Sequence, residues 1–149
     1  MTLWNYEEEK NERRKQRQQI LKVVSMKEVD MVETEKRWKY FRPEEVAGLA
    51  EDLVYKLDRA REFYGHPIVI TSGYRDPNKN DLVGGVKGSE HTTGQGCDVA
   101  APVDPELREK LAWAIGSAGF RRIGSYSKHF HVGISIEHPN PVFWVGDYK

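Results

Sequence analysis

The 149-residue chain is poor in cysteine, has no excess of either charge and contains no long apolar run. Its single cysteine, Cys97, excludes an internal disulfide and a cysteine-rich zinc site. The 23 lysines and arginines balance the 23 aspartates and glutamates, so there is no bulk attraction to nucleic acid or to anionic membranes. No segment has the length and apolarity needed for membrane insertion. The length suits one domain with a substantial core.

The first residues, 1–9, also lack the basic start and apolar centre of a signal peptide. We therefore expect synthesis in the cytoplasm without a signal peptide. If the target lies outside the membrane, another factor must deliver the protein to it.

Residues 1–37 are rich in charge and sparse in apolar side chains. Acids and bases alternate at helical spacing, as in Glu9 with Arg13, which is typical of a solvated helix. We expect a charged, helical N-terminal arm over residues 1–37 and a separate domain over residues 38–149. Two interpretations of the arm stay open: a solvated segment packed weakly on the domain, or a segment that binds a partner or another copy of the chain.

Two segments of the domain have the pattern of helices. Apolar residues recur at helical spacing up to Tyr64, and Arg42-Pro43-Glu44-Glu45 has the features of a first turn, so we predict a helix that starts there. Gly48 is a point at which this helix can divide into two. Asp104 and Pro105 predict the start of a second helix that stops near Gly119.

Other segments have the β-branched or alternating content of strands. They are residues 67–71, residues 96–101, a hairpin formed by 120–124 and 130–135, and an apolar edge strand near 142–145. The stretch 76–88 is rich in Asn, Gly and Asp and is predicted to be a loop. This order predicts an α+β fold in which helices cover one face of a small, mainly antiparallel sheet.

Imidazoles and one carboxylate gather in two of these strand-like regions. Neutral imidazole and carboxylate are zinc ligands, and a catalytic zinc keeps three protein ligands and one open position. His91, Asp98 and His131 make such a set. Any one of these histidines taken alone is better explained as an ordinary surface or core residue, but the cluster favours a zinc site.

The alternation of strand side chains separates the metal ligands from the core. Phe130 and Val132 must face the helices, so His131 lies on the open face of the sheet. Pairing of the last strand with residues 96–101 then places Asp98 beside His131. Cys97 falls on the core side and is read as a small buried hydrophobe.

Five further residues are candidates for chemistry or substrate binding. His129 is two residues before His131 on the same face, where it can act as general base or stabilise the oxyanion of the reacting carbonyl; the alternative is an orienting or solvent-exposed role. Arg75 is a candidate catalytic and substrate-binding cation, with a surface salt bridge as the alternative. Ser89, Tyr74 and Tyr126 complete the substrate-binding candidates, although Ser89 also suits the orientation of His91 and the tyrosines also suit the core.

Three stretches together resemble the zinc D-Ala-D-Ala carboxypeptidase family. They are Ser72-Gly73-Tyr74-Arg75, the run from Ser89 to Asp98 preceded by Gly84-Gly85, and His129-Phe130-His131. This family includes phage endolysins and virion-associated peptidoglycan peptidases and shares its fold with the hedgehog signalling domain. The resemblance runs from about Phe41 to Trp144 and leaves the N-terminal arm outside.

The resemblance implies one zinc ion held by His91, Asp98 and His131, and it implies that Arg75 binds the substrate or polarises its carbonyl. The implied substrate is the stem peptide of peptidoglycan, and the implied enzyme is a zinc metallopeptidase of a phage or prophage. The enzyme would reach the cell wall either after release by a holin or as part of a virion. In a virion, the N-terminal arm would be the segment that attaches it. A D-Ala-D-Ala carboxypeptidase and a catalytically weakened zinc-binding module are the alternatives.

The sequence departs from that family at two positions. Lys128 stands where many relatives carry an acid that acts as the base, and Gly133 stands where close relatives often carry aspartate. We therefore expect His129 to be the general base; the alternative is proton transfer assisted by water or by the substrate. Glu90 is a weaker candidate, because its neighbour His91 is expected to take the inward direction.

Overall fold

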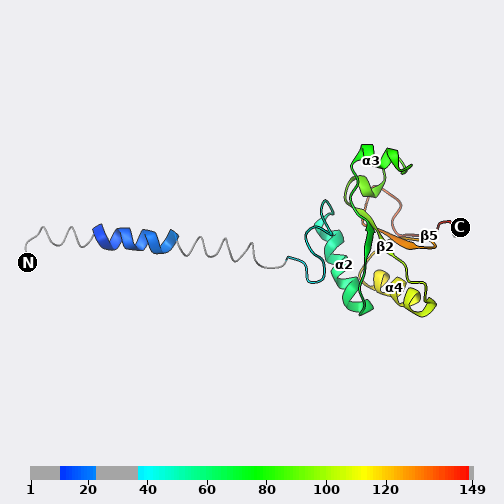
Figure 1. The fold of residues 1–149 in the computed structure, drawn as a ribbon, viewed down its shortest axis with the longest axis horizontal. Helices are drawn as coiled ribbons and strands as arrows, with labels where there is room; N and C mark the ends of the chain where they lie inside the picture. Colours follow the sequence, from blue (N-terminus) through cyan, green and yellow to red (C-terminus); the bar gives the residue numbers. More distant parts are fainter. Residues whose placement is uncertain (1–10, 23–36, 148–149) are drawn as a thin grey trace, which may run out of the picture. The chain divides into compact units, whose positions relative to one another are not determined.

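The computed structural model describes residues 11–22 and 37–147, and the chain divides into two units, residues 1–37 and 38–149. In the first unit, residues 11–22 form an exposed helix (Figure 1). The rest of the predicted arm, before Arg37, lies outside the described residues. None of the helices in the described ranges combines the length and the apolarity needed to cross a membrane.

The second unit is built on a five-stranded sheet. Its strands are β1 (Ile70–Ser72), β2 (Gly96–Ala100), β3 (Arg122–Ser125), β4 (His129–Gly133) and β5 (Val142–Val145). Their order in the sheet is β1-β2-β4-β3-β5, and every neighbouring pair is antiparallel except β3 with β5. The predicted mainly antiparallel sheet is therefore confirmed, and the tail strand β5 lies at an edge, as predicted, but runs parallel to its neighbour.

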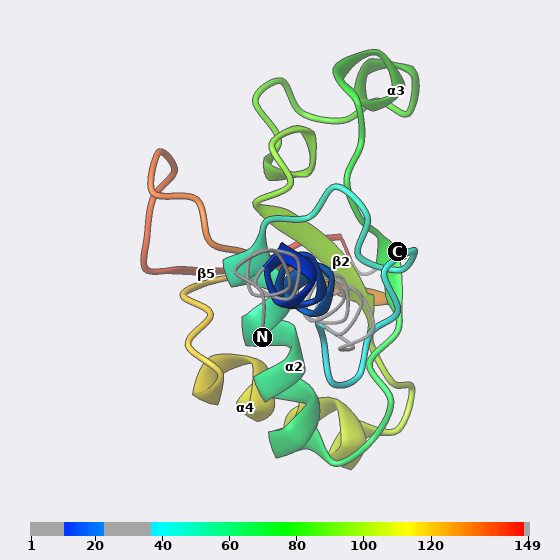
Figure 2. The same cartoon turned by 90° about the vertical axis from the view of Figure 1, so that its left-hand side faces the viewer.

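Two long helices, α2 (Glu51–Tyr64) and α4 (Pro105–Ser117), pack against each other beside the sheet. Figures 1 and 2 show them together at one end of the domain, whereas the short helix α3 (Pro77–Leu82) lies at the opposite end. The start of α4 is capped as predicted, since the Asp104 carboxylate accepts a hydrogen bond from the backbone N–H of Leu107 at 2.9 Å.

The hydrophobic core lies between α2, α4 and one face of the sheet. Its largest fully buried apolar side chains are Leu53, Val54, Leu57, Val99, Leu111, Ile115 and Val132. Cys97 is buried among them as predicted, and burial raises the pKa of its thiol, so it acts as a small hydrophobe. The helices thus occupy one face of the sheet and leave the other face for polar residues.

The predicted start of the first helix is wrong. Residues 42–49 form turns, and α2 begins only at Glu51. Gly48 adopts a left-handed φ of 77°, and the backbone N–H of Ala50 donates to the carbonyl of Gly94 at 2.9 Å. A Cβ on Gly94 would overlap the carbonyl oxygen of Gly48, so these two backbone segments touch directly.

Two smaller predictions also need correction. The stretch 76–88 is not a simple loop, because it contains α3; the Asp76 carboxylate accepts from the backbone N–H of Lys79 at 3.0 Å, and Pro77 occupies the first turn. The first strand was expected at residues 67–71, whereas the ladder covers only Ile70–Ser72. In the first case a helix-capping signal was read as part of a loop, and in the second the strand was correctly expected but placed too early in the chain.

Replacing a buried leucine and an exposed leucine by alanine should show that burial, and not residue type, determines the loss of stability. Leu57 is fully buried, so Leu57→Ala should lower the free energy of unfolding by about 2–5 kcal/mol through lost burial and a residual cavity. Leu82 is 87% exposed on α3, so Leu82→Ala should change it by less than about 0.5 kcal/mol. Chemical denaturation monitored by circular dichroism measures both, and equal effects would contradict the core described above.

Candidate metal centre

The register between β2 and β4 places two site residues side by side. Asp98 pairs with His131, and Val99 pairs with Phe130. Because neighbours along a strand face opposite ways, Val99 and Phe130 enter the core while Asp98 and His131 lie on the open face. This register and this division of faces are as predicted from the sequence.

His91 reaches the same point from a short 3-10 helix, η1 (Glu90–Thr92), just before β2. The hydroxyl oxygen of Ser89 accepts from the backbone N–H of His91 at 3.3 Å and so caps this turn. The imidazole is buried, and its Nδ1 lies 2.8 Å from the carbonyl oxygen of Gly73. A carbonyl only accepts, so Nδ1 carries the hydrogen and Nε2 presents its lone pair to the site.

Three donor atoms converge on one point. Asp98 Oδ1 lies 3.3 Å from His91 Nε2 and 2.9 Å from His131 Nδ1. All three atoms lie within 4.8 Å of one another. Ligands of a tetrahedral zinc, each about 2.0–2.2 Å from the ion, are separated by roughly 3.3–3.6 Å. Both the donor types and their spacing therefore fit zinc.

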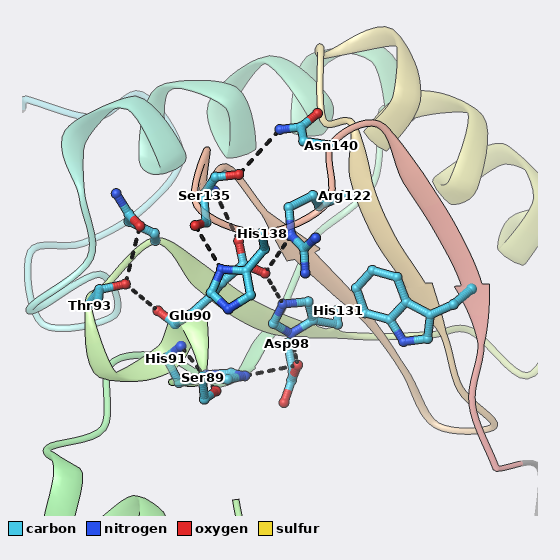
Figure 3. A network of polar contacts seen from close by, with 12 residues as sticks. Ser89, Glu90, His91, Thr93, Asp98, Arg122, His131, Ser135, His138 and Asn140 are labelled. Atoms are coloured by element: carbon cyan, nitrogen blue, oxygen red, sulfur yellow. Dashed lines mark hydrogen bonds and ion pairs between the residues drawn. The ribbon is translucent and has the colours of Figure 1, made fainter. Parts of the chain in front are cut away.

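A buried glutamate holds the far side of His131 (Figure 3). Glu90 Oε2 lies 3.1 Å from His131 Nε2 and accepts from Arg122 Nε at 3.0 Å, while Glu90 Oε1 accepts from the backbone N–H of Ser135 at 3.0 Å. His91 takes the inward direction as predicted, but the tight η1 turn buries Glu90 as well. Glu90 lies behind His131, away from its Nδ1, so it is poorly placed to be the base.

Burial is opposed at each of these groups by the hydrogen bonds and charges of its neighbours, and together the neighbours outweigh it. Burial alone would raise the pKa of Asp98, but its contacts with the imidazoles of His131 and His91 outweigh burial and hold that pKa below its usual range. Burial alone would lower the pKa of His131, yet the two carboxylates beside it raise the pKa. Hydrogen bonds from His131, Ser135 and Arg122 overcome burial at Glu90 and lower its pKa to about 2. Two ionised carboxylates thus flank a basic imidazole.

The three donors lie in a cavity of about 460 Å³. Its lining includes four of the other predicted site residues, which are Arg75, Ser89, Tyr126 and His129. Tyr74 is not part of this lining; its side chain instead packs against the backbone of Gly48, where an added Cβ would lie 2.8 Å from Tyr74 Cβ. The cavity therefore unites the proposed ligands with most, but not all, of the predicted substrate-binding residues.

Arg75 is fixed close to the donors by two partners. Its Nε and one terminal nitrogen, Nη2, donate to the hydroxyl of Ser72 at 3.0 and 2.6 Å. The same Nη2 lies 3.5 Å from Asp98 Oδ2. The cation is thus held over the carboxylate oxygen that is further from the metal-binding point.

His129 forms a wall of the cavity together with two aromatic residues. Its ring stacks on Tyr126, with centroids 4.5 Å apart and an interplanar angle of 14°. The Tyr126 hydroxyl accepts from the indole nitrogen of Trp144 at 2.9 Å. His129 Nε2 lies 3.9 Å from Asp98 Oδ1, so the imidazole is near the donors but outside the tightest group.

Sequence reasoning missed several residues that shape this site. Arg122 and Trp144 were read only as parts of strands, and His138 was given no role, yet all three line the cavity. Arg122 also donates to the carbonyl of Pro139 and contacts the Trp144 ring. One signal was readable: the alternation that puts His131 on the open face also applies to Arg122 and Trp144 on the neighbouring strands.

A small α+β domain that brings two imidazoles and a carboxylate together in an open cavity has the requirements of a metal-dependent hydrolase. Residues 16–135 match the sequence profile of the Peptidase M15 family. This match covers most of the chain, and the chain therefore belongs to the Peptidase M15 family, that of the zinc D-Ala-D-Ala carboxypeptidase. It is a peptidase whose family acts on peptidoglycan.

The matched range corrects the extent of the resemblance noted in the sequence. It begins at residue 16, within the segment 1–37 that was expected to lie outside, and it ends at Ser135, before β5. Among solved structures, the crystal structure of the Serratia marcescens L-Ala D-Glu endopeptidase ChiX is similar, with 19% identity and a TM-score of 0.48. That similarity covers 63% of this chain and 86% of the other. None of the curated proteins compared with the chain matches it.

Zinc titration should identify the ligands. The wild-type chain is expected to bind one zinc ion, and His91→Ala should weaken the affinity by about 100-fold or more, because two donors remain and the removed Nε2 faces the ion. His66→Ala removes an exposed imidazole outside the cavity and should leave the affinity unchanged. Competition with a chromophoric chelator measures both; equal affinities in the two variants would exclude His91 as a ligand.

Proposed function

We propose that this chain is a zinc-dependent peptidase that hydrolyses an amide bond in the stem peptides of bacterial peptidoglycan. The observation that carries the proposal is the convergence of His91 Nε2, Asp98 Oδ1 and His131 Nδ1 within one cavity. Three protein ligands leave one coordination position for water or substrate, which distinguishes catalytic from structural zinc sites. Family membership supports both the reaction and the substrate class.

The residues of this site have separable roles. When bound, zinc supplies a water of lowered pKa and polarises a carbonyl oxygen. Arg75, held by Ser72 and Asp98, presents a fixed cation to the same space. It can bind a substrate carboxylate or the oxygen of the scissile carbonyl.

His129 is the proposed general base. Among the described residues that line the cavity, Asp98 and Glu90 are the only carboxylates, and both are engaged. His129 is about one third exposed, and its stacking on Tyr126 holds the ring near the donors. An imidazole in this position can accept the proton of the attacking water and pass it to the leaving amine.

The charge of the cavity supports an anionic substrate. Arg75 and Lys87 line it as cations, whereas its two carboxylates are neutralised by the imidazoles and by Arg122. Stem peptides carry free carboxylates, which such a lining attracts. Cleavage within the stem and removal of a terminal D-alanine both remain compatible with this lining.

The proposed biological setting is a phage or prophage lytic enzyme. Its support is the resemblance to endolysins and virion-associated peptidases noted in the sequence, which rests on Ser72-Gly73-Tyr74-Arg75, the run from Ser89 to Asp98, and His129-Phe130-His131. Release by a holin or carriage in a virion would bring it to the wall. The charged segment 1–37 is the candidate for attachment to a virion or to another copy of the chain.

A second candidate function is a zinc-binding module without catalysis. It is favoured by one distance: His129 Nε2 lies 3.9 Å from Asp98 Oδ1, close to the separation expected between zinc ligands. If His129 closed the fourth position, the centre would become structural. X-ray absorption of the zinc-loaded protein distinguishes three histidine ligands from two.

Loss of a ligand should abolish turnover. His131→Ala is expected to reduce the release of peptides from purified peptidoglycan by at least about 1,000-fold, as chelator treatment of the wild type should, because the ion is lost. His66→Ala is the matched control and should retain activity. Mass spectrometry of the digest also identifies the bond: free D-alanine indicates a carboxypeptidase, and separated stem peptides indicate an endopeptidase. Undiminished release by folded His131→Ala would refute the proposal.

Replacement of the proposed base has a different signature. His129→Ala should lower kcat by about 100- to 10,000-fold while KM and zinc affinity change little, because proton transfer is lost and the metal ligands remain. If zinc affinity instead falls in parallel with kcat, His129 is a ligand, and the structural module is supported.

A further inference from the structure

Two glycines stand opposite each other on the strands that carry the metal ligands. Gly96 of β2 pairs with Gly133 of β4 in the sheet register. An added Cβ on Gly96 would lie 2.6 Å from Glu90 Cβ, and one on Gly133 would lie 2.6 Å from Glu90 Cδ and overlap both carboxylate oxygens. Real Cβ atoms do not approach other atoms this closely. The glycine pair therefore forms a hollow in the open face of the sheet, and the Glu90 side chain fills it.

The carboxylate in this hollow is held from several directions. Its side chain is only 3% exposed, and its two oxygens accept from the backbone N–H of Ser135 and from Arg122 Nε, each at 3.0 Å. The remaining neighbour is His131 Nε2, at 3.1 Å from Glu90 Oε2 (Figure 3). Since the first two donors fix the carboxylate, its position in turn defines where the His131 ring can lie.

This contact selects the nitrogen that His131 offers to a metal. An ionised carboxylate only accepts, so Nε2 must carry a hydrogen. Nδ1 is then the ring atom available for a cation, and it is the one that faces Asp98 Oδ1 at 2.9 Å. Loss of the carboxylate would remove the hydrogen bond at Nε2 that distinguishes this orientation of the ring from the flipped one.

We propose that Glu90 is the positioning residue for His131, and that the Gly96–Gly133 pair is the space that admits it. The inference deepens the zinc peptidase function proposed above and rests on it. It assigns a role to Glu90 that is neither base nor ligand. It also makes position 133 the place from which a replacement carboxylate can be supplied.

The test is a carboxylate transfer between the two positions. Glu90→Ala should weaken zinc affinity by about 10- to 100-fold, because the imidazole loses its orienting acceptor. In Glu90→Ala/Gly133→Asp, the new side chain enters the vacated hollow from β4, and most of the affinity should return. Glu90→Ala/Gly133→Ala fills part of the same space without a charge and should show no recovery. Glu109→Ala, at an exposed position on α4, should match the wild type.

A second readout separates positioning from simple loss of structure. Nitrogen-15 spectra of the zinc-loaded protein should show Nδ1 as the bound atom of His131 in the wild type and in the carboxylate-transfer variant, but a mixture of Nδ1 and Nε2 in Glu90→Ala. Thermal unfolding verifies that each variant is folded. Glu90→Gln covers the case in which Glu90→Ala does not fold: its amide must turn an NH2 group toward one of the donors, and affinity should fall by an intermediate amount.

The outcomes also distinguish this inference from the proposed function. Unchanged affinity and unchanged Nδ1 binding in folded Glu90→Ala would overturn the positioning role and leave the peptidase intact. Failure of the carboxylate-transfer variant to exceed Glu90→Ala/Gly133→Ala would overturn it too. Zinc binding with the expected affinity order, but no turnover of peptidoglycan by the wild type, would overturn the function and keep the positioning role. A wild type that binds no zinc would overturn both.

Discussion

The antiparallel pairing of β2 with β4 is the constraint on which the rest of the structure depends. It sets Asp98 opposite His131 on the open face and Val99 opposite Phe130 on the core face. A shift of one residue would reverse both faces at once, burying the polar groups and exposing the apolar ones. The apolar pattern that forms the core therefore also fixes the geometry of the metal centre. Stability and chemistry are specified by the same register.

Much of this arrangement could be predicted from the sequence, because its causes are local and periodic. The alternation around His131 separates core from site, and the cap at Asp104 marks a helix without reference to the rest of the fold. To predict the metal site from the three ligand-type residues in two strand-like segments, it was then necessary only that those two strands be neighbours in the sheet. The parallel direction of β5 had no such signal, because a short apolar strand reads the same in either direction.

Two of the errors arose where distant segments decide local structure. The start of α2 is set by the hydrogen bond from Ala50 to Gly94, 44 positions further along the chain, which no helix pattern contains. The burial of Glu90 was equally unreadable, since it depends on two glycines that meet only after the sheet has formed. A glutamate beside a histidine in a turn is ordinarily solvated. Here the hollow, the Ser135 N–H and Arg122 make burial favourable.

The contact between Gly48 and Gly94 joins two backbone segments that are far apart in the chain. The turn that precedes α2 lies directly against the loop that delivers His91, with no side chain between them to absorb a displacement. A residue inserted on either side, or a bulkier one at either glycine, would move the partner segment and with it one corner of the metal centre. In related proteins, changes around Gly48 and around Gly94 are therefore expected to occur together, and insertions and deletions should accumulate elsewhere in the chain.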